Sequence, residues 1–300
     1  MYTAYKLTTD HTKIKFYIFL LLVGVLLLVS ALAQYIVPHD PYLQDLSNAL
    51  QPPSWQFPFG TDEYGRCLLS RVIVGATTTV YSSLALVLFT SVLGSIIGVF
   101  CGYIGGKTDA VIMRLSDVFL AFPGLVFAIA VAGVLGGGIL NAAISLALIA
   151  WPRFTRIVRG QVLAVKNMSY MHAAKISGCP WYKMIFKHIM PNVIGPVVVT
   201  AALDIGVTIM ELAGLSFLGL GAAPPTAEWG SMMSKGRSMM QTAPWTILFP
   251  GLAILLTVML FNLFGDTIRD MFDPTQRRVS VVNCFCKLKN KVKVEGDVNV

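Results

Sequence analysis

The chain has 300 residues, of which 55% are hydrophobic and only 13% are charged. With a mean hydropathy of +0.70, it has too few polar groups to cover a soluble globular protein of this length, so we expect it to lie in a lipid bilayer. Its net charge of +8 does not indicate nucleic-acid binding, because the Lys and Arg residues lie between apolar blocks, where the positive-inside rule places them. Five cysteines, with no paired spacing before Cys284 and Cys286, do not indicate a disulfide framework.

Six apolar blocks predict six transmembrane helices, since about 20 apolar residues span a hydrocarbon core of about 30 Å. They cover residues 16–37, 76–102, 111–135, 139–158, 193–214 and 246–265. The fourth block is the weakest, because its fully apolar part stops at Trp151. Beyond it Arg153, Arg156 and Arg159 recur every three residues, and we expect this helical face to snorkel to the lipid headgroups.

The basic residues predict the orientation of these helices. If residues 1–15 are cytoplasmic, the segments on that side hold 19 of the 23 Lys and Arg residues. The four on the other side are Arg66, Arg71, Lys235 and Arg237. Both termini are therefore predicted in the cytoplasm, with residues 38–75 and 216–245 outside.

Two features that point to other kinds of protein are set aside. Residues 13–33 resemble a signal peptide with a cleavage site, but the apolar run continues through Val37, which favours an uncleaved first helix. Gly106-Lys107-Thr108 resembles part of a phosphate-binding loop, yet Cys101 stands where that motif needs a glycine. We therefore predict no nucleotide site, no cofactor and no bond-making chemistry in this chain.

The outside segments are expected to be loops. Five prolines in residues 38–75 disfavour a continuous helix, and residues 60–71 are interpreted as a solvated cap that leads into the second helix. Glycines and paired prolines in residues 216–245 predict a re-entrant or folded-back turn. Four methionines follow at helical spacing: Met232, Met233, Met239 and Met240. Their thioethers suit soft metals, but an interfacial helix that packs its Met face is favoured, and no metal ligand is assigned.

The basic segment 168–192 is the most informative part of the sequence. Residues 168–177 predict a short helix that Gly178 breaks, and Pro180 starts a second helix that Pro191 stops. Four residues of the second helix share one face by i, i+3, i+4, i+7 spacing: Trp181, Met184, Ile185 and His188. Such an apolar face suits docking in a groove of another protein, whereas an ordinary connecting loop of this length is uncommon.

The same segment resembles the EAA loop of ABC-importer permeases. The resemblance rests on His172-Ala173-Ala174, Gly178 and, after nine further residues, His188-Ile189-Met190-Pro191. It implies that the loop inserts into an ATPase subunit and transmits the closure of that subunit to the membrane helices. Together with the apolar face, it assigns these residues to ATPase coupling: His172, Ala173, Ala174, Gly178, Trp181, Met184, Ile185, His188 and Pro191.

Three further stretches look like the dipeptide, oligopeptide and nickel branch of these permeases. They are residues 60–71, 215–221 and 225–230, and the resemblance covers residues 16–274, nearly the whole chain. Three residues depart from the family pattern: His172 replaces a Glu, Met190 replaces a Leu, and Cys67 replaces an acidic residue.

The resemblance implies an all-α polytopic protein with six transmembrane helices and the type I ABC-importer (MetI-like) permease architecture. It implies a multi-pass protein in the cell membrane of a prokaryote, with a core over residues 76–274. The implied partners are a second, homologous permease, two ATPase subunits, an extracytoplasmic solute-binding protein and membrane lipid. The basic tail, residues 275–300, matches no known pattern and is expected to be disordered or held weakly by anionic lipid.

Two acidic residues in the fifth block, Asp204 and Glu211, lie seven apart and so nearly on one helical face. Carboxylates inside a membrane face a protein interior or a water-filled path, which places them on the translocation pathway or at the interface with the partner permease. A purely structural hydrogen-bonding role is the alternative.

The cargo is left between two classes. Residues 203–206 and PTAEWG in residues 225–230 lean toward nickel, as an ion or a chelate, which carboxylates suit. A dipeptide or oligopeptide is the alternative, since the same carboxylates suit an amino terminus. A rival from another class is an ion-coupled secondary transporter that uses Asp204 and Glu211 as ion sites, although the sequence shows no convincing internal repeat.

Overall fold

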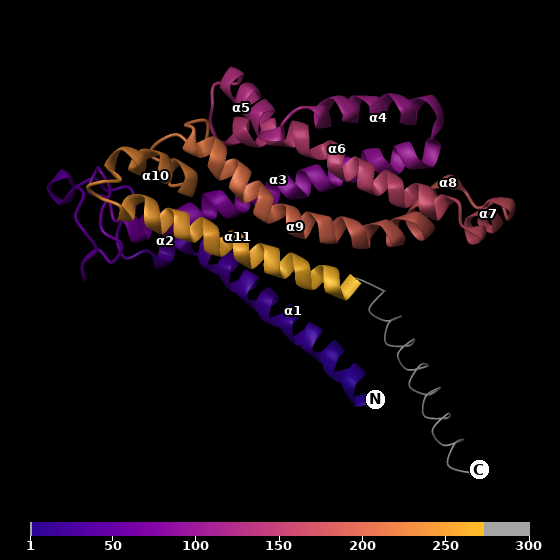
Figure 1. The fold of residues 1–300 in the computed structure, drawn as a ribbon, viewed down its shortest axis with the longest axis horizontal. Coiled ribbons are helices and arrows are strands. Elements are labelled where there is room, and N and C mark those ends of the chain that lie inside the picture. The colour runs from indigo at the N-terminus through magenta and orange to yellow at the C-terminus, as the bar shows by residue number, and fades with distance from the viewer. Residues whose placement is uncertain (1, 273–300) are drawn as a thin grey trace, which may run out of the picture.

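The computed structural model describes residues 2–272, and within them the chain is helical apart from loops and one isolated bridge between Thr61 and Cys67. The predicted all-α class is confirmed. The long helices run along the length of the molecule (Figure 1): α1 (Tyr2–Ala31), α3 (Leu68–Ile104), α6 (Ile139–Lys166), α9 (Met190–Phe217) and α11 (Trp245–Phe272). The tail predicted over residues 275–300 lies outside the described residues.

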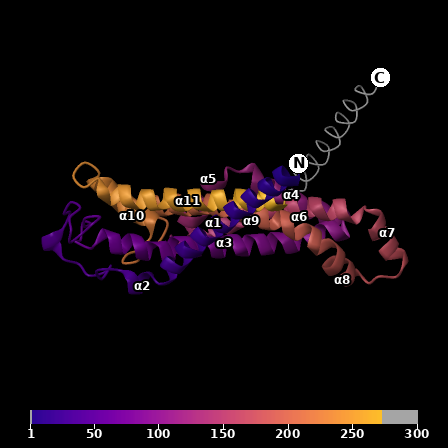
Figure 2. The same cartoon turned by 90° about the horizontal axis from the view of Figure 1, so that it is seen from below.

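The two ends of the helical bundle carry different segments, as Figures 1 and 2 show. At one end lie the start of α1, the end of α11, and the short helices α7 (Ser169–Ile176) and α8 (Trp181–Lys183). At the other end lie α2 (Ala33–Ile36), the loops that follow it with η1 (Leu46–Asn48), and α10 (Trp229–Gly236) with η3 (Arg237–Met239). The structure therefore gathers at one end the segments that charge counting assigned to one side.

The second long helix starts earlier than predicted. Helix α3 begins at Leu68 rather than at residue 76, and it continues for 37 residues. At 1.5 Å per residue its length is about 55 Å, well beyond a hydrocarbon core of about 30 Å. The early start places Arg71 inside the first turn, where its charge is buried against a loop aspartate.

The third apolar block does not form one helix. It divides into α4 (Gly106–Ala121) and α5 (Gly124–Val134), which are bent by 90° from each other. The break is at Phe122 and Pro123, because proline lacks an N–H group and forces the residue before it into an extended conformation. Phe122 has a φ of −86° and a ψ of 145°.

The count of six spans is therefore not fully met. By length and composition, four helices within the described residues are able to cross a membrane, and five if the bent pair counts as one span. Helix α6 is not among them, because its second half carries the three arginines noted above.

Helices α3 and α6 pack closely through glycines. A Cβ atom at Gly94, Gly98 or Gly102 would meet atoms of α6 at 2.6 to 2.8 Å. Small residues of this kind let two membrane helices approach with their backbones near contact. This packing fixes the rotation of α6, so that its arginines point toward α4 and α9.

Candidate functional site

The segment 168–192 begins with a short helix that breaks at Gly178, as predicted. Helix α7 ends where Gly178 takes a φ of +73°, a left-handed conformation that glycine adopts without strain. The N–H groups of Ser177 and Cys179 donate to carbonyls of α7, each at 3.0 Å, and close the turn. Pro180 is the N-cap of α8, so the break and the restart lie where the sequence places them.

The prediction that Pro191 stops the second helix is wrong. Helical structure continues from Trp181 to Phe217, because η2 (Met184–Ile189) winds as a π-helix. There the N–H of Met190 donates to the carbonyl of Ile185, five residues back. This wider turn accommodates a proline ring that would clash with an α-helical carbonyl. Residues 181–217, which include the membrane helix α9, therefore form one continuous rod.

The structure divides the predicted apolar face of the second helix. Met184 is 7% exposed and packs with Ile189 against valines of α3, α6 and α9. Ile185 and His188 are half-buried, and Trp181 is exposed. A single docking face formed by these residues is therefore wrong, because Met184 belongs to the core of the permease itself.

A different set of apolar side chains faces outward at this end. We call it the coupling patch, and its members are Ile176, Trp181, Tyr182 and Phe186. Ile176 and Phe186 are 88% and 71% exposed. The same segment also exposes His172, Ala173, Lys175, Gly178, Lys183, Lys187 and Pro191, while Ala174 is half-buried. Apolar surface rimmed by polar and charged groups marks a protein interaction site.

Asp204 and Glu211 line one cavity of about 160 Å³, between α4, α5, α6 and α9. Their predicted placement on one face is confirmed. Asp204 is 5% exposed and forms an ion pair with Arg153 of α6, which supports a structural role for this residue. Glu211 is half-buried and makes no ion pair with any residue that the structure describes, so its carboxylate is available to the cavity.

The arginines of α6 do not extend to the headgroups as predicted. Each forms an ion pair with an aspartate of the same chain; the pairs are Arg153–Asp204, Arg156–Asp117 and Arg159–Asp109. Arg159 binds both oxygens of Asp109, at 2.5 and 2.6 Å, the two-pronged geometry that suits guanidinium and carboxylate. Since the partners lie 39 to 51 residues away, helical periodicity around the arginines gave no sign of them.

The PTAEWG motif fastens the loop before α10 to α3. Glu228 is fully buried and caps α10, where it accepts hydrogen bonds from the N–H groups of Gly230 and Ser231, both at 2.8 Å. Burial raises the pKa of the Glu228 carboxyl, and these two hydrogen bonds oppose the rise. The indole N–H of Trp229 donates to the carbonyl of Val72 at 2.8 Å. From the sequence, this motif indicated only the family resemblance and the cargo, and its structural role was not predicted; an acid directly before a helix start was the available signal.

The four methionines do not share one environment. Met232 is buried in the core, whereas Met240 is 63% exposed. Packing of Met232 agrees with the favoured interpretation of an interfacial helix. Within the part of the chain that the structure describes, no three His, Cys, Asp or Glu side chains come together as metal ligands.

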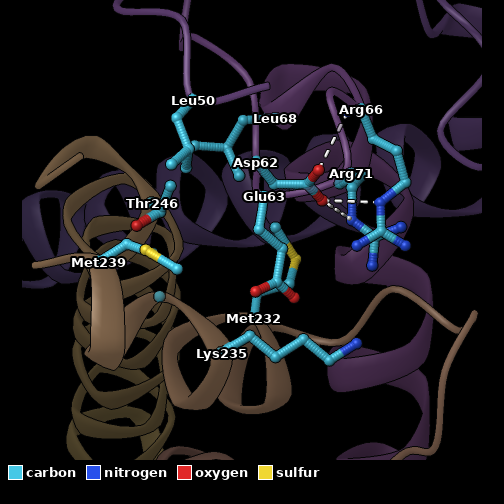
Figure 3. A pocket seen from close by; sticks show the side chains of 11 residues that line it. Leu50, Asp62, Glu63, Arg66, Leu68, Arg71, Met232, Lys235, Met239 and Thr246 are labelled. Atoms are coloured by element: carbon cyan, nitrogen blue, oxygen red, sulfur yellow. Dashed lines mark hydrogen bonds and ion pairs between the residues drawn. The ribbon is translucent and has the colours of Figure 1, made fainter. Parts of the chain in front are cut away.

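The interpretation of residues 60–71 as a solvated cap is wrong. Asp62, Arg66 and Arg71 form a buried group that we call the outer charge cluster (Figure 3). The Nε of Arg66 donates to Asp62 Oδ2 at 2.7 Å, and the Nε of Arg71 lies 3.5 Å from the same oxygen. Arg71 also donates to the carbonyl of Pro41 at 3.0 Å. Arg66 and Arg71 are 3% and 2% exposed, respectively. Residues 60–71 are therefore part of the folded core.

Comparison with known proteins gives the family. Residues 94–278 match the family described as binding-protein-dependent transport system inner membrane component. The chain is 43% identical over 253 residues to the probable D,D-dipeptide transport system permease protein DdpC of Escherichia coli (strain K12), covering 84% of this chain and 85% of that protein. It is 40% identical to the dipeptide transport system permease protein DppC of Haemophilus influenzae, over 86% of this chain and 88% of that one. It is 39% identical to the glutathione transport system permease protein GsiD of Pectobacterium atrosepticum, over 88% and 87%.

A solved structure shares the fold. An inward-facing form of the MetNI methionine ABC transporter superposes with a TM-score of 0.52 at 16% identity, covering 69% of this chain and 98% of that one. At this identity the likeness concerns the fold alone, and it agrees with the expected type I architecture. The chain belongs to the family of binding-protein-dependent transport system inner membrane components: it is a permease subunit of an ABC importer, works with ATPase and solute-binding proteins, and is not itself an enzyme.

Proposed function

We propose that this chain forms half of the membrane path of an importer for dipeptides or short oligopeptides. The names of the three relatives above refer to dipeptides or glutathione, which favours the peptide alternative over nickel. The structure supports the same preference. PTAEWG has a structural role through Glu228 and Trp229, and Asp204 is already paired with Arg153, so neither feature that leaned toward nickel is free to bind a cation.

The coupling mechanism rests on one observation, the continuous rod from the coupling patch to the cavity. Phe186 on the patch and Asp204 in the cavity lie 18 residues apart on this rod, about 27 Å at 1.5 Å per residue. When bound ATP closes the two ATPase subunits, they carry the patch with them. Because the segment is helical throughout, the movement reaches the cavity as a displacement of α9 against α6, and the permease changes from inward-open to outward-open.

The coupling role covers the residues around the patch. His172, Ala173 and Gly178 are exposed at this end and supply polar and backbone contacts beside the apolar anchors. Ala174, Ile185, His188 and Pro191 shape the rod behind the patch, and Met184 holds it to the core. Buried aromatic anchors contribute most of the binding energy in protein interfaces, so Trp181 and Phe186 are the principal contacts.

The proposed topology places the end with α7 and α8 in the cytoplasm. Its support is the charge distribution, since 19 of the 23 Lys and Arg residues belong to segments assigned to that side. Both termini then lie in the cytoplasm, and the segments 38–67 and 218–244 lie outside. A homologous second permease completes the path, with two ATPase subunits below it and the solute-binding protein above.

Glu211 is the proposed cargo contact in the path, and the Arg153–Asp204 pair holds its cavity in shape. A carboxylate that has no partner suits the protonated amino terminus of a passing peptide. Membership of the ABC-importer permease family argues against the other mechanism that the sequence left open, an ion-coupled secondary transporter in which the same carboxylate binds the coupling ion.

Uptake by the complete importer in proteoliposomes tests the cargo and the energy source together. We expect ATP-dependent uptake of a labelled dipeptide that unlabelled dipeptide competes and nickel chloride does not. Nickel uptake that dipeptides leave unaffected would overturn the peptide proposal. Uptake that persists without ATP and collapses with the ion gradient would instead support the secondary transporter.

A further inference from the structure

A small cavity of about 20 Å³ adjoins the outer charge cluster (Figure 3). Arg66 and Arg71 line it from one side, and Lys235 lines it from α10. Two carboxylates, of Asp62 and Glu63, are also among its lining residues. In Figure 3 the carboxylate of Glu63 extends toward α10, away from the two guanidinium groups. The cavity therefore joins side chains of three elements that are distant in sequence.

The buried guanidinium groups have donors without acceptors. An arginine carries five N–H donors, yet Arg66 uses only its Nε, toward Asp62, besides lying over the ring of Tyr64 at 4.6 Å. Arg71 uses Nη1 toward Pro41 and approaches Asp62 with Nε. Among the described residues no acceptor is bound to either Nη of Arg66 or to Nη2 of Arg71. These donors are not fully enclosed by protein atoms, because among the described residues the fully buried side-chain groups without a partner are the hydroxyls of Ser95, Ser116 and Ser216. The free guanidinium donors therefore touch accessible space, and both arginines line the cavity.

Positive charge is also in excess here. Three cations face two carboxylates, and Asp62 is already occupied: its Oδ1 accepts the N–H groups of Tyr64 and Arg66 at 2.9 and 3.0 Å. Lys235 forms no ion pair with any residue that the structure describes. Burial, followed by the charges of Arg66 and Arg71, lowers the pKa of the Lys235 ammonium group, and Glu63 and Asp62 oppose this effect.

We infer that this cavity binds one small monovalent anion of about chloride size. The volume is enough for one water-sized guest, since about 10 to 15 Å³ is the minimum for a water, and it is too small for a phosphate or for an amino acid. An anion there would accept from the unpaired guanidinium donors and neutralise the surplus charge. It would join the loop of residues 60–67 to α10, beside the start of α11, at the end of the bundle opposite the coupling patch.

The thermal unfolding of the complete purified importer in detergent tests this site. Chloride is titrated against gluconate at constant ionic strength, so that general screening stays fixed. We expect the unfolding midpoint to rise with chloride, as binding to the native state alone requires. Lys235→Met should shift the chloride titration to about tenfold higher concentration, since it removes one charged contact. Lys107→Met, on an exposed lysine in the first turn of α4, should respond like the unmodified protein.

A structural readout accompanies the titration. Crystals or frozen samples with bromide in place of chloride should show density for one ion between Arg66, Arg71 and Lys235. A midpoint that is the same in chloride and gluconate would overturn the inference, as would a chloride response that Lys235→Met leaves unchanged. Density for a water molecule alone in the presence of bromide would also overturn it.

Discussion

The two ends of this permease handle charge and apolar surface in opposite ways. At the end with α7 and α8, large apolar side chains such as Ile176 and Phe186 are exposed and lysines surround them. At the other end, Asp62, Arg66 and Arg71 are buried together, and Glu228 is fully enclosed. Apolar groups in water and charged groups out of water both carry a free-energy cost. Binding of a partner protein would reduce the cost of the exposed apolar groups. Ion pairs and hydrogen bonds within the chain reduce the cost of the buried charged groups.

The difference indicates a division of labour. The exposed end presents apolar side chains that, in the proposed coupling mechanism, another subunit covers. The buried end is held by contacts within the chain, which fasten the loops there to α3. Substitutions at the two ends should therefore differ in what they affect: assembly at one end, folding at the other.

Asp62→Ala should produce the largest effect on stability. It leaves two buried guanidinium groups without their carboxylate, and removal of one partner from a buried ion pair costs about 3 to 5 kcal/mol. Unfolding in detergent by heat or denaturant measures the change. Asp40→Ala, on an exposed aspartate at the same end, should cost no more than about 1 kcal/mol. Equal effects of the two substitutions would show that the outer charge cluster does not hold this end.

Met184→Ala and Phe186→Ala compare two neighbours on the rod. Met184 is buried among valines, so its truncation should lower the free energy of unfolding by about 2 to 5 kcal/mol. Phe186 is exposed in the isolated chain, so its truncation should change stability by no more than about 0.5 kcal/mol. The permease purified without its partners is the sample to measure. If Phe186→Ala lowered the free energy of unfolding more than Met184→Ala, Phe186 would be the buried residue and Met184 the exposed one, which contradicts the structure.

Gly178→Ala and Gly60→Ala compare a turn at each end. Both glycines have a positive φ, of +73° and +76°. A Cβ at Gly178 meets nothing within 4 Å, so the substitution should cost only the left-handed strain of about 1 kcal/mol. At Gly60 a Cβ would lie 2.6 Å from the carbonyl oxygen of Gln51, and the loss should be larger. Gly178→Asn, which tolerates this conformation, should recover part of the loss, and equal losses at the two glycines would contradict the difference in packing.

Glu228→Gln should have the smallest effect, visible in the pH dependence. Burial raises the pKa of Glu228 in the folded state, so its contribution to stability is fully present below its unfolded pKa of about 4.3 and is lost as pH rises through the folded value. The free energy of unfolding of the unmodified protein should fall between these two pKa values. In Glu228→Gln the free energy of unfolding should depend less on pH over the same range. If stability depended on pH as steeply in Glu228→Gln as in the unmodified protein, the pH dependence would come from groups other than Glu228.

The sequence predicts those features that depend on local pattern. Hydropathy identifies the membrane class, Gly178 and Pro180 mark the break between two short helices, and seven-residue spacing places Asp204 and Glu211 on one face. These follow from helix geometry and backbone preferences, which act within a few residues.

The features that the sequence misses depend on contacts between distant segments. Arg159 pairs with Asp109, 50 residues away, and the periodicity of α6 does not indicate that partner. The π-turn before Pro191 likewise follows from the packing of Met184 and Ile189 into the core, and a proline alone indicates only a helix end. Residues 60–71 look solvated because they are polar, yet Arg66 and Arg71 are buried against the carboxylate of Asp62.

Retention of the ATPase subunits by a permease with Phe186→Asp tests the central claim most directly. The account predicts that the ATPases bind at least about 30-fold more weakly, as expected for loss of an anchor of about 2 kcal/mol. The unfolding midpoint of the isolated permease should stay unchanged, and Phe186→Leu should retain the ATPases. ATPase subunits that remain bound to the Phe186→Asp permease as tightly as to the unmodified one would contradict the coupling patch as the site of their docking.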